Sequence, residues 1–142
     1  MNLKKNIWLY LALFMTLIIW INSMLSAEVS SQQSGFLVNL ALSVLSLFKI
    51  VIPIDAVSSF IRTYAHFAEF FMLAICWGFY LLNKSISSLW VIVIIIVTAF
   101  MDESIQLFSL GRAFQFFDIM IDSIGGLFGF IFIQGFTKIK NK

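Results

Sequence analysis

Side chains that could do chemistry occur in three stretches of an otherwise apolar sequence. The first supplies Arg62, His66 and Glu69, the second supplies Asp102, Glu103 and Gln106, and the third supplies Arg112, Asp118 and Asp122. Imidazole and carboxylate groups act as general acids and bases, and both ligate divalent cations. Residues three or four apart share one face of a helix, so His66 pairs with Glu69, and Asp118 pairs with Asp122.

The charges in this set do not balance, because five carboxyl groups stand against two arginines, and against three cations when His66 is protonated. One interpretation is structural: the cations pair with acids and hold a helix bundle together. The excess acids, however, must be protonated, face water or bind a cation. We therefore expect a polar pocket, in which His66, Glu69, Asp102 and Asp122 are candidate ligands of a divalent cation. His66 with a carboxylate is equally a candidate acid–base pair. The sequence has neither a serine nucleophile elbow nor a glycine-rich phosphate loop, so it establishes no cofactor and no catalytic residue.

The composition predicts that this pocket lies in a membrane protein. Of the 142 residues, 61% are hydrophobic and 11% are charged, and the mean hydropathy is +1.02. A soluble domain carries about 25% charged residues, and so few charges do not cover a globule in water. A single cysteine gives no disulfide framework. These values argue against a soluble domain, a disordered chain and a nucleic-acid-binding protein. They favour an all-helical integral membrane protein that contacts membrane lipids.

The elements that must position the candidate residues are predicted as four transmembrane helices in a single domain, residues 1–142. The spans cover about residues 6–25, 60–82, 88–107 and 115–136, each near the roughly 20 residues that a bilayer crossing needs. The first span also resembles a signal peptide, but Leu25 does not suit cleavage after Ala27, so we favour an uncleaved anchor. In the last span, the spacing Gly125-x-x-x-Gly129 predicts close approach of another helix.

Residues 36–52 are predicted as an amphipathic helix at the membrane interface, after a polar loop at residues 27–35. The polar residues of this helix form one stripe: Asn39, Ser43, Ser46 and Lys49. A helix of this kind lies in the interface and does not cross the bilayer. We expect Pro53 to end it and Asp55 to cap the helix that follows.

The charge distribution predicts that both termini face the cytoplasm. With four spans, six lysines lie on the inner side (Lys4, Lys5, Lys84, Lys138, Lys140 and Lys142), and Lys49, Arg62 and Arg112 lie towards the outside, as the positive-inside rule requires. All seven acids then fall in the outer half. From the rise of a helix, Glu69, Asp102 and Asp122 each lie roughly 20 Å from the inner surface. Three helices thus place carboxyl groups in one layer.

Three stretches of the sequence resemble the signatures of VanZ-like membrane proteins. Residues 61–70 resemble the first, Asp102-Glu103-Ser104-Ile105-Gln106 followed by Gly111-Arg112 resembles the second, and Asp118 with Asp122 and Gly125-Gly126 resembles the third. Together they cover most of residues 60–130, in the family's order. The sequence departs from the family at Thr63, where Lys is frequent, at Phe70, where Tyr is frequent, and at Leu110, where Pro is frequent.

The resemblance implies a multi-pass protein of a bacterial plasma membrane that acts in cell-envelope physiology or in susceptibility to the glycopeptide teicoplanin. The nine candidate residues would then form an outward-facing acidic pocket that binds an envelope lipid, a cell-wall precursor or the antibiotic. The alternative is an intramembrane enzyme that acts on a lipid-linked substrate with metal or His66–Glu69 acid–base chemistry. A transporter is disfavoured, because Phe70–Leu82 and Leu89–Phe100 are almost uniformly apolar and give no continuous polar path.

Overall fold

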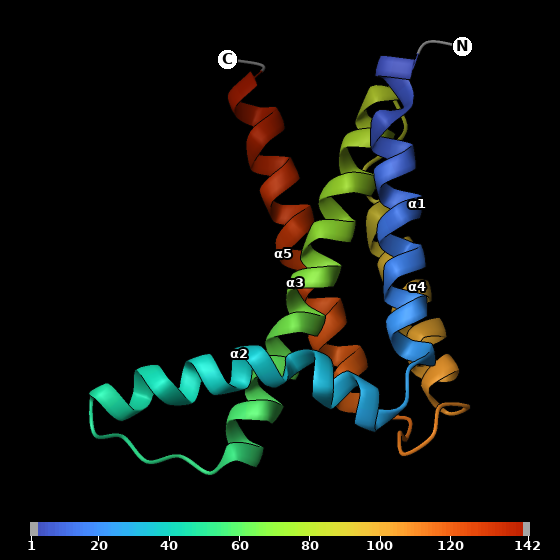
Figure 1. Cartoon of the computed structure of the whole chain (residues 1–142). Coiled ribbons are helices and arrows are strands. Elements are labelled where there is room, and N and C mark those ends of the chain that lie inside the picture. Colours follow the sequence, from blue (N-terminus) through green and yellow to red (C-terminus); the bar gives the residue numbers. More distant parts are fainter. Residues whose placement is uncertain (1–2, 141–142) are drawn as a thin grey trace.

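The computed structural model describes residues 3–140, and within them the chain is all-helical and has no strand. Its five helices are α1 (Leu3–Met24), α2 (Ala27–Leu47), α3 (Ile54–Asn83), α4 (Trp90–Gln106) and α5 (Phe116–Lys140). Helices α1, α3, α4 and α5 form a bundle, and α2 lies across one end of it (Figure 1). The first turn of α1 and the last turn of α5 lie at the opposite end. The predicted all-helical class is confirmed.

Three helices are long and apolar enough to cross a membrane: Asn6–Met24, Ile54–Asn83 and Phe116–Lys138. The fourth bundle helix, α4, has 17 residues. Large apolar side chains such as Phe14, Val97 and Phe128 are exposed on the outside of the bundle, which is the surface that contact with lipid requires. Among the lysines used to predict the orientation, Lys142 lies outside the described residues, and so do the side chains of Lys4, Lys5 and Lys140.

The structure corrects the predicted interfacial helix, which begins and ends earlier than expected. Residues 27–35 are not a loop but the first half of α2, and the helix ends at Leu47, well before Pro53. Ser26 caps α2, and its hydroxyl accepts a hydrogen bond from the backbone N–H of Val29 at 3.3 Å. A cap of this kind satisfies one of the free N–H groups that open a helix. The serines and glutamines of this segment are therefore part of a helix.

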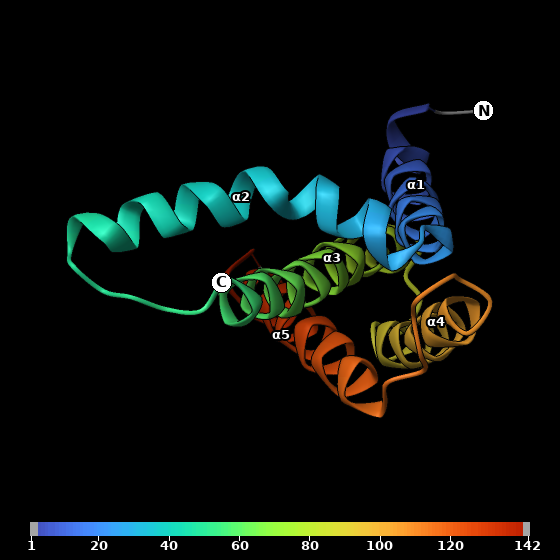
Figure 2. The same cartoon turned by 60° about the horizontal axis from the view of Figure 1, so that its bottom comes forward.

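The connection from α2 to α3 also differs from the prediction. The chain leaves α2 through Lys49, which has a φ of 57°, and Figure 2 shows that α2 projects well beyond the bundle before the chain returns to α3. Pro53 occupies the N-cap position of α3 without a side-chain hydrogen bond, so the capping role predicted for Asp55 is wrong. Asp55 lies instead within the first turn, where a carboxylate interacts favourably with the helix dipole.

Two glycines of α5 bring this helix against α3, as the sequence predicted. A Cβ atom at Gly125 would lie 2.3 Å from the carbonyl oxygen of Phe67, and one at Gly129 would lie 2.6 Å from the α3 backbone. Backbones can approach this closely only where small residues face them. Asp122 precedes Gly125 by about one turn, so the contact holds Asp122 against the face of α3 that carries His66.

An apolar core closes the bundle on the side towards the chain termini. It combines residues of α1, α3 and α4: Ile19, Phe70, Leu73, Ala74, Leu81, Val91, Ile95 and Ala99. On each of the three helices, these core residues lie on the side of the polar site residues that faces the chain termini: Ile19 precedes Asn22, Phe70 follows Glu69, and Ala99 precedes Asp102. The nine candidate residues therefore lie towards the end of the bundle that α2 crosses.

Candidate functional site

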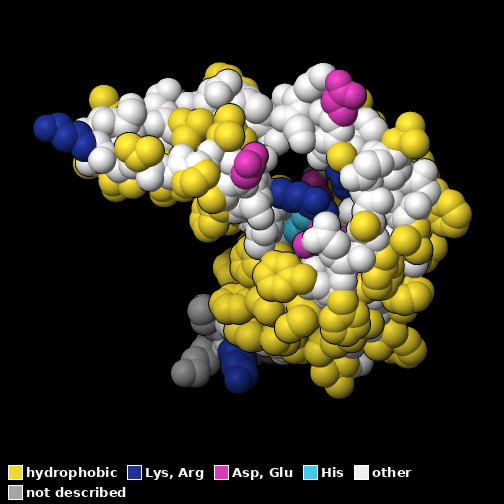
Figure 3. All heavy atoms as spheres, turned by 90° about the horizontal axis from the view of Figure 1, so that it is seen from below, with side chains coloured by type: hydrophobic (Ala, Val, Ile, Leu, Met, Phe, Trp, Pro, Cys, Tyr) yellow, Lys and Arg dark blue, Asp and Glu magenta, His cyan; other side chains and the backbone are white. Residues whose placement is uncertain are grey.

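The candidate residues meet at the end of the bundle that α2 crosses. Five of them line a pocket of about 270 Å³: Arg62, His66, Glu69, Asp102 and Arg112. Figure 3 looks onto this end and shows basic, acidic and histidine side chains at the bottom of a hollow. Three more candidates, Gln106, Asp118 and Asp122, hydrogen-bond to members of the pocket. The ninth candidate, Glu103, follows Asp102 in the sequence and is buried. It accepts a hydrogen bond from the backbone N–H of Gln115 at 2.7 Å.

Two pairs link α3 to α5. Arg62 Nη2 lies 2.7 Å from Asp118 Oδ2, with the Arg62 side chain 39% exposed and that of Asp118 8% exposed. One turn deeper, His66 Nδ1 lies 3.1 Å from Asp122 Oδ1, and the Asp122 side chain is fully buried. These pairs follow from the close approach of the two helices, because residues one turn apart on α3 face residues one turn apart on α5.

The first helix contributes two polar residues that are not among the sequence-based candidates. Asn22 Nδ2 donates a hydrogen bond to Glu69 Oε1 at 3.0 Å, and the Ser23 hydroxyl donates one to Asp102. Gln106 Nε2 donates to the second oxygen of Asp102 at 3.0 Å. A polar pair at the end of an apolar span, such as Asn22 and Ser23, is a sequence signal for interhelical contacts of this kind.

The polar half of α2 forms the remaining wall of the pocket. Ser30, Ser31, Gln33 and Ser34 all line it. These residues lie in the segment that composition alone predicted as a loop. Their helical conformation gives them a common face, so hydroxyl and amide groups stand opposite the charged residues of α3. The pocket therefore has charged groups on the bundle side and neutral hydrogen-bonding groups on the α2 side.

The loop between α4 and α5 holds Arg112 at the pocket. This loop is fastened to the junction of α1 and α2 by two hydrogen bonds: Ser109 Oγ donates to the Ser23 carbonyl at 2.6 Å, and the Ala27 N–H donates to the Leu110 carbonyl at 3.0 Å. Gly111, with a φ of 75°, supplies the left-handed turn that favours glycine.

Arg112 differs from the other two cations of the pocket in having no close acid. Among the side chains that the structure describes, no carboxylate oxygen lies within the 4.0 Å ion-pair distance of its guanidinium. Burial, and secondly the like charge of Arg62, lowers the pKa of Arg112 below its usual range. An anion in the pocket would offset both effects, so Arg112 is placed to bind one.

A buried cluster that includes two residues of the pocket lining meets the distance requirement for a metal site. His66, Asp102 and Asp122 each offer a ligand atom within 4.8 Å of the other two, and all three residues are buried. Glu69, the fourth ligand predicted from the sequence, is not part of this group. Buried acceptor oxygens without a hydrogen-bond partner are found on Glu103, Gln106 and Asp122. An unpaired buried acceptor costs about 1–3 kcal/mol, so these oxygens favour a positive or proton-donating group beside them.

The fold and the site define a polytopic helical membrane protein with a polar cluster inside one end of its bundle. The sequence model of the VanZ/LLP1 family matches residues 7–137, which include all nine candidate residues. The chain therefore belongs to the VanZ/LLP1 family, as the three signature stretches indicated. No curated protein and no solved structure matches the chain significantly.

Proposed function

We propose that this protein crosses a bacterial plasma membrane four times, with both termini in the cytoplasm and the polar pocket at the outer surface. The 17 residues of α4 are at the lower end of the range for a transmembrane helix, about 17–25 residues. Lys84 caps the end of α3 remote from the pocket, and Lys138 lies near the corresponding end of α5. Lysines at that end support a cytoplasmic location for it.

The pocket, in this proposal, binds the head group of an envelope amphiphile and so affects glycopeptide susceptibility. The amphiphile is a membrane lipid, a lipid-linked cell-wall precursor or the lipoglycopeptide teicoplanin. The observation that carries the proposal is the lining of the pocket, in which Arg112 has no acid of the described residues within ion-pair distance and lies among hydrogen-bonding groups. A head group with one anion and several hydroxyl or amine groups matches this mixed lining. Structural pairing alone does not account for a half-buried arginine without a close acid.

Substitutions of three residues that line the pocket test this proposal. Glu69→Gln, Asp102→Asn and Arg112→Ala are each expected to abolish the effect of the expressed protein on teicoplanin susceptibility while the protein stays inserted in the membrane. The matched control is Gln134→Ala, which removes a polar contact of 2.6 Å to Ser88 at the far end of the bundle. If the three pocket variants and the control all keep full activity, the polar cluster is purely structural and the proposal fails.

A second candidate function is metal-dependent catalysis on a lipid-linked substrate. The specific observation in its favour is the buried group of His66, Asp102 and Asp122, together with the unpartnered Oδ2 atom of Asp122. A divalent cation bound there would activate water or polarise a phosphoryl oxygen. Equilibrium dialysis of the purified protein against Zn²⁺ and Mn²⁺ tests it. We expect the native chain to bind one ion, the Glu28→Gln variant to bind it equally, and the His66→Ala variant to lose it. If the native chain binds no more ion than the His66→Ala variant does, this function is contradicted.

A further inference from the structure

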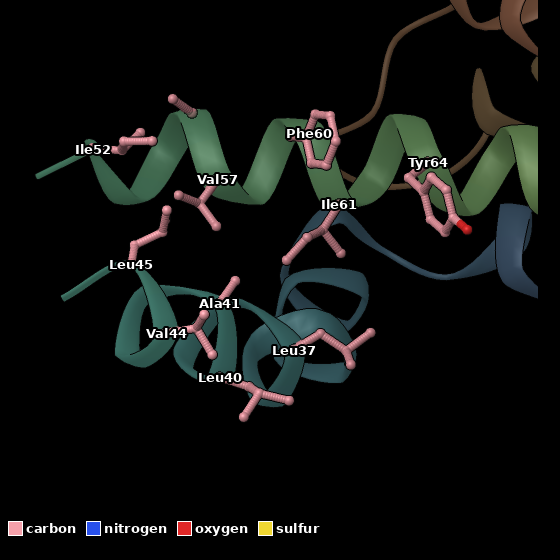
Figure 4. A pocket seen from close by; sticks show the side chains of 11 residues that line it. Leu37, Leu40, Ala41, Val44, Leu45, Ile52, Val57, Phe60, Ile61 and Tyr64 are labelled. Atoms are coloured by element: carbon pink, nitrogen blue, oxygen red, sulfur yellow. The ribbon is translucent and has the colours of Figure 1, made fainter. Parts of the chain in front are cut away.

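A second cavity lies beside the polar pocket, and its lining is apolar. It is a groove of about 800 Å³ between the C-terminal half of α2 and the first turns of α3. In Figure 4, Leu45, Val57 and Ile61 point into the space between the two helices. The only polar side-chain atom among the lining residues is the hydroxyl of Tyr64. A groove with this lining offers hydrocarbon contact and almost no hydrogen bonding, so its occupant must be apolar where it lies in the groove.

The groove and the polar pocket adjoin each other. Leu37 of α2 and Ile61 of α3 line both of them. On the N-terminal side of Leu37, α2 presents serines such as Ser30 and Ser34 to the pocket. On its C-terminal side, α2 presents Val44 and other aliphatic residues to the groove. One helix therefore changes from a polar to an apolar lining at the point where the two cavities meet.

We propose that the groove holds one hydrocarbon chain of the same amphiphile whose phosphate-bearing head group lies in the polar pocket. This inference rests on the proposed function, and it names the ligand class as a phospholipid or another lipid phosphate. Its support is the shared wall at Leu37 and Ile61, because a molecule that fills both cavities must be polar at one end and apolar at the other. The volume of the groove is also in the range of small-molecule sites, about 300–1,000 Å³.

The polar pocket sets the chemistry of the head group. The Arg112 guanidinium has no acid within ion-pair distance among the described side chains, and guanidinium groups bind phosphate through two parallel hydrogen bonds. Glu69 and Asp102 line the same pocket and accept hydrogen bonds from hydroxyl groups. A phosphate that carries a polyhydroxyl group satisfies both requirements. Phosphatidylglycerol has this combination and is therefore the probe of choice.

The exposed apolar residues of the groove give a reason for a lipid in particular. Leu37 is 51% exposed, Val44 is 46% exposed and Phe60 is 71% exposed. Lipid chains are present in any membrane at high concentration and contact such residues without a cost in buried polar groups. A helix from a second copy would cover the groove, but it would leave the adjoining polar pocket without a partner for Arg112.

Filling the groove with an indole ring tests the inference. Ala41→Trp places the ring within the groove, and Ala56→Trp does so from the α3 side. Leu47→Trp is the matched control, because Leu47 is 80% exposed on the same helix and does not line the groove. Each purified variant is titrated with phosphatidylglycerol in phosphatidylcholine nanodiscs, and separately with glycerol 3-phosphate, which has a head group and no chain. Thermal unfolding of each variant confirms that it is folded.

We expect Ala41→Trp and Ala56→Trp to weaken phosphatidylglycerol binding at least tenfold, with glycerol 3-phosphate binding unchanged, and Leu47→Trp to change neither. If both groove variants bind phosphatidylglycerol as the native chain does, the groove inference is overturned while head-group binding stands. If the native chain binds neither probe, the inference is overturned, whereas the proposed function is decided separately by the teicoplanin susceptibility of the pocket variants. If the native chain forms a dimer that Ala41→Trp dissociates, the groove belongs to a second copy and the inference is also overturned.

Discussion

The contact between α3 and α5 is the basis of the candidate site, and Gly125→Ala perturbs it directly. The added Cβ atom would lie 2.3 Å from the Phe67 carbonyl oxygen, whereas ordinary contact begins at 3.4 Å. The two helices must therefore move apart locally by about 1 Å. Excess atoms in a packed interface cost about 1–3 kcal/mol. The same displacement lengthens the 3.1 Å contact between His66 and Asp122, one turn away.

Gly135→Ala isolates the effect of the contact from the general effect of alanine. Replacing glycine within a helix gains about 1 kcal/mol from helix propensity, and this gain applies to both variants. Gly135 lies on the same helix with nothing within 4 Å of its added Cβ, so it has the gain without the clash. For a chain of this size, 1 kcal/mol shifts Tm by about 3–4 °C. Gly125→Ala should therefore melt about 3–12 °C below Gly135→Ala.

The single cysteine supplies the assay. Cys76 is buried and free, so a thiol-reactive dye reports unfolding in detergent without an added label. Both variants and the native chain are heated with the dye, and the midpoints are compared. Equal midpoints for Gly125→Ala and Gly135→Ala would refute the close backbone contact, because the clash would then have no measurable cost.

Three further predictions concern the site and the topology. Asp102→Ala should lower stability by about 1–3 kcal/mol, because the buried Gln106 amide loses its acceptor and the Ser23 hydroxyl keeps only the Ile19 carbonyl; unchanged thermal unfolding would contradict those contacts. A double-mutant cycle of Arg62→Ala and Asp118→Ala should give a coupling of about 0.5–1 kcal/mol, since the pair is close but Arg62 is 39% exposed; strictly additive effects would argue against the pair. In a Cys76→Ala background, Gln32→Cys should react with an impermeant maleimide on intact cells, and Asn83→Cys only after permeabilisation; the reverse pattern would overturn the proposed orientation.

The bundle helices were predictable from the sequence because their signals are local. Apolar runs of sufficient length fix α1, α3 and α4 to within a few residues, and the spacing of Gly125 and Gly129 indicates the contact that α5 makes. The acids could be placed in one layer from helix rise alone. The structure brings Asp102 and Asp122 together with His66, whereas Glu69, the third acid of the predicted layer, is not part of this group.

Helix α2 was harder to predict, because its N-terminal half has the composition of a loop. Serine and glutamine are compatible with a helix when one face packs against a polar surface, and composition does not reveal that surface. Residues such as Ser31 and Ser34 line the pocket only because α2 crosses the bundle end. The groove could not be predicted from the sequence either, because it depends on the angle between α2 and α3 and on the turn at Lys49.

The two pairs between α3 and α5 have a consequence for how the protein is made. Arg62 with Asp118, and His66 with Asp122, each join residues 56 positions apart. At a synthesis rate of about 5–20 residues per second, Arg62 and His66 leave the ribosome roughly 3–11 s before their partners on α5. During that interval, the polar face of α3 needs water at the membrane surface or a temporary protein partner. A nascent chain that stops before α5 carries Arg62 and His66 unmatched, which gives cellular quality control a chemical mark of incomplete synthesis.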